Sequence, residues 1–233
     1  MKILVIIPAY NEEKNIKKVV SDLQENYKQY DYLVVNDCSN DNTEKILFEQ
    51  KTEYVNLPVN LGIGGAVQTG YRYALANNYD IAVQMDGDGQ HNSQYIEDII
   101  MPIIDGEADA VIGSRFIEKK GFQSSFLRRL GINFLGNLIF LLCGTRIMDA
   151  TSGFRAVNRK GIELFAKEYA QDYPEPEAIL ALSIRKLKIK EVPVIMNERE
   201  GGTSSINGMK SIYYMVKVSV ALLVTKFITK GKK

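Results

Sequence analysis

Short apolar runs rich in β-branched residues alternate along this chain with segments in which apolar residues recur every three or four positions. The runs that predict strands lie at residues 2–7, 32–35, 54–57, 81–85, 110–112 and 189–194, and the helix-like segments at residues 16–23, 43–48, 65–76 and 178–187. This alternation predicts βαβ units, and therefore an α/β fold with a mainly parallel central sheet flanked by helices.

Polar clusters follow three of the predicted strands. They are Asn11-Glu12, Asn36-Asp37 and Asp86-Gly87-Asp88. In sheets of this kind, ligands bind beyond the carboxyl ends of the strands. We therefore expect the three clusters to converge on one crevice.

The composition is that of an ordinary globular protein, with 29 basic and 28 acidic residues among 233 and 45% hydrophobic residues. Cys38 and Cys143 form no CxxC pair, and the N-terminus does not resemble a signal peptide, so we expect a cytoplasmic protein with reduced thiols. Six lysines and no acidic residue lie in residues 206–233. Because the excess positive charge is confined to this tail, no nucleic-acid partner is expected.

The segment from Asp86 to His91 carries the clearest chemical signal. Residues i and i+2 of an extended segment point to the same side, so Asp86 and Asp88 can face one cation. Two carboxylates together with substrate phosphates suit Mg²⁺ or Mn²⁺. A calcium loop of the EF-hand type is disfavoured, because His91 stands where that loop needs Gly and a strand precedes it. A plain acidic turn is the remaining alternative.

Glycines between Asn60 and Ala66 also invite a functional interpretation. A dinucleotide fingerprint fails on spacing, because Val67 stands at the third glycine position. The glycines still permit close approach of backbone amides to an anion, and a tight turn explains them equally well.

The C-terminal part of the chain is more apolar. Residues 130–145 carry no charged side chain but are too few to span a bilayer. In the tail, Lys210, Tyr214, Lys217, Ala221 and Thr225 form one helical stripe beside a broad apolar remainder. We expect a catalytic domain at residues 1–205 and a basic amphipathic helix at 206–233 that binds a membrane surface or a partner. The alternative is a terminal helix packed on its own domain.

Six motifs occur in sequence between residues 7 and 155. They are Ile7-Pro8-Ala9-Tyr10-Asn11-Glu12, Val35-Asn36-Asp37, Asn60-Leu61-Gly62, Asp86-Gly87-Asp88-Gly89-Gln90-His91, Gly113-Ser114-Arg115 and Asp149-Ala150-Thr151-Ser152-Gly153-Phe154-Arg155. Their order and spacing resemble glycosyltransferase family 2, most closely its dolichol-phosphate mannose synthase-like branch. The resemblance covers about residues 3–205 and implies a GT-A nucleotide-diphospho-sugar transferase fold and transfer with inversion.

The resemblance also implies a donor site with bound Mg²⁺ or Mn²⁺. It assigns the nucleotide-sugar to Pro8, Ala9, Tyr10, Glu12, Asp37, Gly62, Asp86, Gly87, Arg199 and Ser204. Asp37 is expected to bind the base, and Asp88, with Gln90 nearby and Asp86 beside it, the metal on the diphosphate. His91 is expected to shape this loop. Ser205 stands where the branch usually has Lys, so Arg199 is expected to carry more of the phosphate contact.

The attacking group decides which further residues are needed. A sugar hydroxyl requires a general base, whereas a lipid phosphate is already an anion. Glu177 stands near the place of a Glu-Asp pair that provides the base in many relatives, although capping of a helix explains it equally well. Asp149 is the second candidate base. The resemblance places Arg115, Arg128, Arg129 and Ser152 near the acceptor, and exposed arginines without a ligand are the alternative for Arg128 and Arg129.

These observations favour an inverting, metal-dependent glycosyltransferase in which Asp88, Asp86 and Arg199 stabilise the leaving diphosphate. The expected acceptor is a polyprenyl phosphate or a sugar on a polyprenyl diphosphate, used in bacterial surface-polysaccharide assembly at the inner face of the cell membrane. Because the chain stops at Lys233, a small integral membrane protein is a possible partner. The alternatives are a nucleotidyltransferase and a non-catalytic sugar-nucleotide-binding subunit of a membrane complex.

Overall fold

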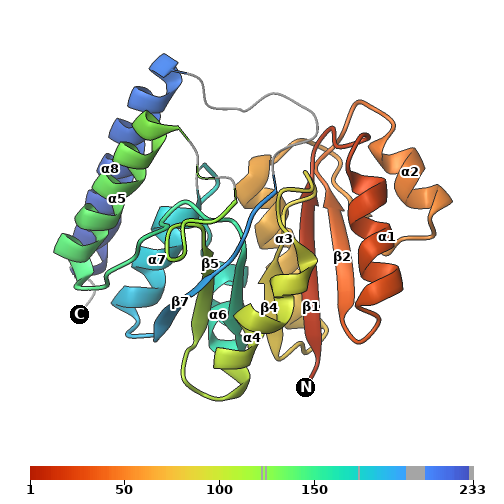
Figure 1. Ribbon diagram of the computed structural model, residues 1–233, viewed down its shortest axis with the longest axis horizontal. Coiled ribbons are helices and arrows are strands. Elements are labelled where there is room, and N and C mark those ends of the chain that lie inside the picture. The colour runs from red at the N-terminus through yellow and green to blue at the C-terminus, as the bar shows by residue number, and fades with distance from the viewer. Residues whose placement is uncertain (122, 124, 173, 198–207, 231–233) are drawn as a thin grey trace.

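A seven-stranded sheet forms the centre of the molecule in the computed structural model, which describes residues 1–230 apart from 122, 124, 173 and 198–207 (Figure 1). Its strands are β1 (Ile3–Ala9), β2 (Asp31–Asn36), β3 (Tyr54–Asn56), β4 (Ile81–Gln84), β5 (Ala110–Ser114), β6 (Arg155–Asn158) and β7 (Ile189–Pro193). Their order is β3-β2-β1-β4-β6-β5-β7. All neighbouring strands pair in parallel except β6, which runs antiparallel to both β4 and β5.

Helices cover both faces of this sheet. They are α1 (Ile16–Asn26), α2 (Thr43–Glu49), α3 (Gly62–Ala76), α4 (Ile96–Ile104), α5 (Phe126–Cys143), α6 (Arg159–Lys167), α7 (Pro174–Ile184) and α8 (Gly208–Lys230), with a short 3₁₀ turn at Ser93–Tyr95. Successive side chains of a strand point to opposite faces. Accordingly, Val5 packs in the core with α1, α2 and α4, whereas Ile6 packs in the core with α3 and α6.

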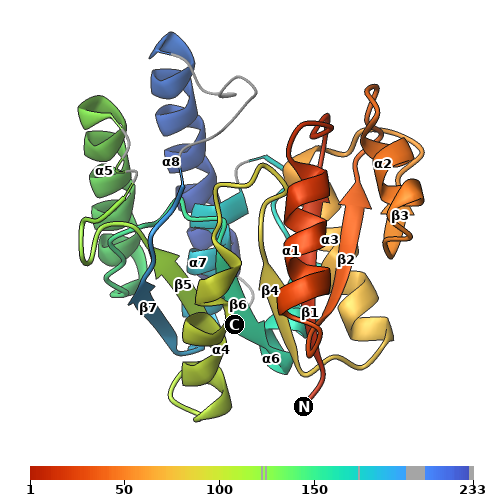
Figure 2. The ribbon, with the colours of Figure 1, turned by 45° about the vertical axis from the view of Figure 1, so that its right-hand side comes forward.

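A third core lies at the β7 edge, where α5, α7 and α8 pack together. Val218 and Leu222 of α8 are buried there with Leu135 and Ile139 of α5. Figure 2 shows α5 and α8 side by side at this edge, and both helices begin at the same end of the molecule. None of the described helices combines the length and the apolar character needed to cross a membrane.

The elements agree with the predicted pattern in most places, with two instructive differences. The structure adds α4, α5, α6 and β6, which the periodicity did not predict. It also begins α7 at Pro174, four positions before the predicted start at Ala178. Proline is well tolerated in the first turn of a helix, where its missing N–H has no partner to lose.

Candidate active site

Loops after β1, β2 and β4 meet at one edge of the sheet, as the sequence predicts. Backbone hydrogen bonds join them, because Asp37 N–H donates to the Ala9 carbonyl at 2.9 Å and Gly87 N–H donates to the Pro8 carbonyl at 3.3 Å. Asn11 N–H also donates to Ser39 Oγ at 2.9 Å. The three polar clusters therefore form one continuous rim.

The loop that follows β4 is held by His91. The backbone N–H of Asp86 donates to His91 Nδ1 at 2.9 Å, and the imidazole stacks on Phe154 with ring centroids 5.0 Å apart. Within the loop, Gln90 N–H donates to Asp88 Oδ1 at 3.0 Å. His91 thus orders the loop that carries both aspartates, the role expected from the sequence.

Asp86 and Asp88 have the chemistry of a site that shares a divalent cation with substrate phosphates. Asp86 Oδ1 is buried and has no hydrogen-bond partner within the described part of the chain. No group of three His, Cys, Asp or Glu side chains suited to a metal occurs among the described residues. Magnesium commonly binds through one or two carboxylates and takes its other ligands from phosphate and water. The aspartates therefore fit the predicted Mg²⁺ or Mn²⁺ site, with Gln90 on the same loop.

Gly153 lies directly against the Asp86 carboxylate. A Cβ at this position would lie 2.9 Å from Asp86 Oδ2 and 3.2 Å from Oδ1. Real Cβ atoms almost never approach so closely, so any side chain here displaces the carboxylate. The Ser-Gly-Phe-Arg motif thus contributes the space in which Asp86 sits.

We expect Gly153→Ala to weaken metal-dependent binding of a nucleoside diphosphate by about 10- to 100-fold, the range typical for disturbed support of a metal ligand. The measurement is calorimetric titration with Mn²⁺ present. Gly131→Ala is the control, since its added Cβ meets only the flexible Met215 side chain. Equal affinities for the two variants would show that Asp86 tolerates the displacement.

Asp37 is the residue that the family resemblance assigns to the nucleoside base. This residue is buried, and its Oδ1 accepts the Leu61 N–H at 2.7 Å. Burial raises the pKa of Asp37, while the backbone N–H groups of Leu61 and Gly62 oppose that rise. Gly62 has φ +75°, which favours glycine. Asp37 thus fixes the turn that starts α3, and its predicted bond to a base stays a prediction.

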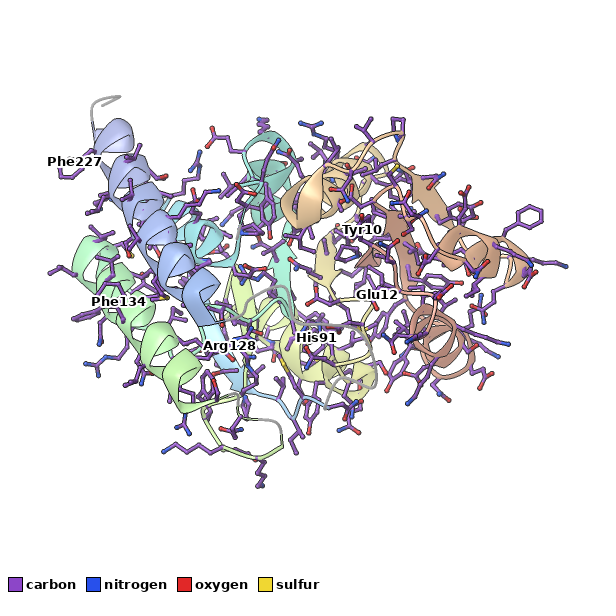
Figure 3. All side chains as sticks on the ribbon, turned by 90° about the horizontal axis from the view of Figure 1, so that it is seen from above. Tyr10, Glu12, His91, Arg128, Phe134 and Phe227 are labelled. Carbon is purple, nitrogen blue, oxygen red and sulfur yellow. The ribbon has the colours of Figure 1, made fainter. Side chains whose placement is uncertain are left out.

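Other predicted donor residues lie on the same rim. Pro8 and Ala9 end β1, while Tyr10 is exposed and Glu12 is partly buried in the loop that follows (Figure 3). Arg199 and Ser204 lie outside the described residues. Asn197, the last described residue before that segment, donates its N–H to the Gln90 carbonyl at 2.9 Å.

Glu177, the first candidate base, lies in the first turn of α7, and its role as a base stays a prediction. Its side chain is directed toward α8, where it is hydrogen-bonded to Thr225, and burial raises its pKa. Glu175 is the residue whose charge interacts with Asp86, Arg155 and Arg128. Positions two apart on a helix point to nearly opposite sides. The carboxyl groups of Glu175 and Glu177 therefore lie on different sides of α7.

Asp149, the second candidate base, is fully buried and bonded to Arg115. Arg115 Nε donates to Asp149 Oδ2 at 2.7 Å, and its Nη2 donates to Oδ1 at 2.6 Å. Glu191 of β7, a residue that the sequence did not single out, accepts the Met148 and Asp149 N–H groups at 2.8 Å each. Asp149 and Arg115 thus form a buried ion pair, and the roles of Asp149 as a base and of Arg115 near the acceptor stay predictions.

The remaining predicted acceptor residues differ in their surroundings. Ser152 is buried, and its Oγ accepts the Phe154 N–H at 3.3 Å, while its place near an acceptor stays a prediction. Arg129 lies over the Phe116 ring, 5.8 Å from its centroid. Arg128 is exposed at the start of α5 and lowers the pKa of Glu175, so its charge acts on the site.

Arg155 is a second site residue to which the sequence assigned no role. It is almost completely buried, and its guanidinium donates to the Ser152 carbonyl and, at 3.3 Å, to the Glu175 carbonyl. Gln84 and Tyr169 lie in the same buried cluster, where Tyr169 Oη donates to Gln84 Oε1 at 3.1 Å. The arginine thus ties the start of β6 to the start of α7, and its place in the Ser-Gly-Phe-Arg motif was the available signal.

Comparisons with known proteins agree with this geometry. A model of glycosyl transferase family 2 matches residues 4–165. A UDP-N-acetylglucosamine–dolichyl-phosphate N-acetylglucosaminyltransferase of Methanococcus voltae is 34% identical, over 94% of this chain and 96% of its own. A polyprenol monophosphomannose synthase of Mycolicibacterium smegmatis is 31% identical, over 93% of this chain and 85% of its own.

A solved structure with a similar fold is the glucosyl-3-phosphoglycerate synthase of Mycobacterium tuberculosis in complex with Mn²⁺, UDP and phosphoglyceric acid. The TM-score is 0.71 at 21% identity, over 97% of this chain and 78% of that one. This likeness confirms the predicted α/β fold of the GT-A type.

Proposed function

Because the chain belongs to glycosyl transferase family 2, and is therefore a glycosyltransferase, we propose that it moves a sugar from a nucleotide-diphospho-sugar to a polyprenyl phosphate, with inversion. The observation that supports this choice of acceptor is the set of contacts made by the two candidate bases. Glu177 faces α8 and Asp149 is bonded to Arg115. A lipid phosphate needs no base, because it attacks as an anion. Relatives named for dolichyl-phosphate and polyprenol substrates support the same choice.

Asp86 and Asp88 would hold Mg²⁺ or Mn²⁺ in this reaction, and the Mn²⁺ complexes of similar folds support that assignment. The ion would supply positive charge to the diphosphate as the bond to the sugar breaks. His91 and Gly153 keep the two carboxylates in place. On the acceptor side, Arg128 provides a cation at the start of α5 that suits an incoming phosphate.

The remaining assignments concern the cellular setting. We infer a peripheral protein at the inner face of the cell membrane, since relatives are named for lipid-linked acceptors. The role in bacterial surface-polysaccharide assembly and the small membrane partner stay predictions. The relatives come from archaea as well as bacteria.

The test is transfer from labelled UDP-, GDP- and dTDP-sugars to undecaprenyl phosphate with Mn²⁺. We expect a product with one sugar and one phosphate that mild acid cleaves. Glu177→Gln is expected to keep turnover within about twofold of wild type, because Glu177 contacts α8 instead of the reacting groups. Transfer only to an existing lipid-linked sugar, or loss of turnover in Glu177→Gln, would contradict the phosphate acceptor.

A further inference from the structure

Residues 169–172, which lie between α6 and α7, contact both the metal loop and the turn that begins α3. At the inner end, Tyr169 Oη donates to Gln84 Oε1 at 3.1 Å, and Gln84 ends β4, two positions before Asp86. The Tyr169 ring also packs edge-on against Phe165, with ring centroids 5.0 Å apart. The inner end of this segment is therefore anchored to the strand that leads into the metal loop.

The middle of the segment lies against the start of α3. The Gly64 N–H donates to the Gln171 carbonyl at 3.1 Å. Gly64 stands in the first turn of α3, where backbone N–H groups have no partner within the helix, so Gln171 supplies one from outside. A Cβ on Gly64 would lie 2.5 Å from Gln171 Cα and closer still to the Ala170 carbonyl. The two backbones are in direct contact, so a shift of the segment also shifts the turn that Asp37 holds through Leu61.

The outer end of the segment is held by α8. Lys217 Nζ of α8 forms an ion pair with Asp172 Oδ2 at 2.5 Å, and Thr225 of α8 is hydrogen-bonded to Glu177. Lys217 and Thr225 belong to the polar stripe that the sequence predicts for this helix, and both are directed toward the domain. A cavity of about 260 Å³ lies between the segment, α7 and α8. Polar contacts therefore carry much of the link between α8 and the segment.

Residues 169–172 thus connect α8 with both parts of the donor site. Coupling between distant parts of a protein travels through contiguous contacts of this kind. We propose that residues 169–172 position the donor site and that α8 holds them in place, so that a displacement of α8 weakens the binding of a nucleotide-sugar. This inference rests on the proposed function and adds positioning residues to it. Because such coupling is reciprocal, a bound nucleotide also stabilises α8 in its position.

Lys217→Glu is the variant that separates α8 from the segment, because it adds a carboxylate beside those of Asp172 and Glu177. We expect it to raise the dissociation constant of a nucleoside diphosphate with Mn²⁺ at least about fivefold, the effect of losing one hydrogen bond. The measurement is calorimetric titration with UDP, GDP and dTDP in the absence of lipid and acceptor. Lys226→Glu makes the same change further along α8 and is expected to bind as wild type.

Two further variants test whether the effect passes through the segment. Lys217→Glu/Asp172→Lys restores an ion pair with the charges exchanged, and its dissociation constant is expected to return to within about twofold of wild type. Tyr169→Phe removes the hydroxyl that donates to Gln84 at the inner end. It is expected to weaken nucleotide binding about fivefold, although every contact of α8 is left intact.

Hydrogen exchange measures the reciprocal effect. We expect nucleoside diphosphate with Mn²⁺ to slow the exchange of α8 amides in wild type and in Lys226→Glu, but not in Lys217→Glu. The inference is overturned if Lys217→Glu binds nucleotide as tightly as wild type, if the charge exchange leaves binding weak, or if bound nucleotide leaves exchange in α8 of wild type unchanged. The proposed function survives each of these results. A wild type that binds no nucleoside diphosphate would contradict the proposed function itself.

Discussion

Asp88→Asn is expected to abolish metal-dependent binding of the donor nucleotide and to lower sugar transfer at least about 100-fold. Asp88 lies in the same loop as Asp86, between β4 and the 3₁₀ turn, and its carboxylate already accepts the Gln90 N–H at 3.0 Å. The amide keeps the size and one acceptor oxygen, so the loop remains folded. It removes the negative charge that a divalent cation requires.

The measurement is calorimetric titration of nucleoside diphosphate with and without Mn²⁺. Wild type should bind far more tightly with the metal, and the variant equally weakly in both conditions. Asp105→Asn makes the same chemical change at an exposed residue that ends α4, and it should behave as wild type. A variant at Asp88 that still responds to Mn²⁺ would remove this residue from the metal site.

Asp149→Asn is expected to destabilise the protein by about 3 kcal/mol, which lowers the melting temperature by roughly 6–12 °C in a chain of this size. The reason is the buried guanidinium of Arg115, whose two bonds to Asp149 have lengths of 2.7 and 2.6 Å. Removing one partner of a buried ion pair leaves the other charge uncompensated. The measurement is thermal unfolding followed by circular dichroism.

The double variant Arg115→Met/Asp149→Asn provides the control, because it removes both charges. We expect it to recover most of the lost stability. A general base behaves differently: its replacement stops transfer while the melting temperature stays unchanged. That pattern in Asp149→Asn would return Asp149 to the reaction.

The strands of this fold could be predicted because parallel strands buried on both faces are short apolar runs. Strand β6 could not, since its sequence Arg155-Ala156-Val157-Asn158 begins with a buried arginine and holds only two apolar residues. Helix α5 was seen only as a stretch without charges. Its apolar residues occur on the exposed side as well as the buried side, and this weakens any helical period.

In the site, too, features that depend on local sequence could be predicted, whereas features that depend on tertiary contacts could not. Asp86 and Asp88 were predicted because their arrangement depends only on spacing within one loop. The choice between Glu175 and Glu177 depends on the rotation of α7, and the orientation of α8 depends on which side chains find partners in α5 and α7. The pairing of Arg115 with Asp149 joins residues 34 positions apart, and no local pattern reveals it.

The strand order has a consequence for how the chain is assembled during synthesis. The half-sheet β3-β2-β1-β4 comes entirely from residues 3–84. The ribosome therefore synthesises all four of its strands before any residue of β6 or β5. The outer edge of β4 then stays unpaired until residues 155–158 are synthesised and pair with it in the antiparallel direction. An open strand edge is a template for incorrect pairing. In the nascent chain, β6 is therefore the strand that covers the β4 edge of this half-sheet.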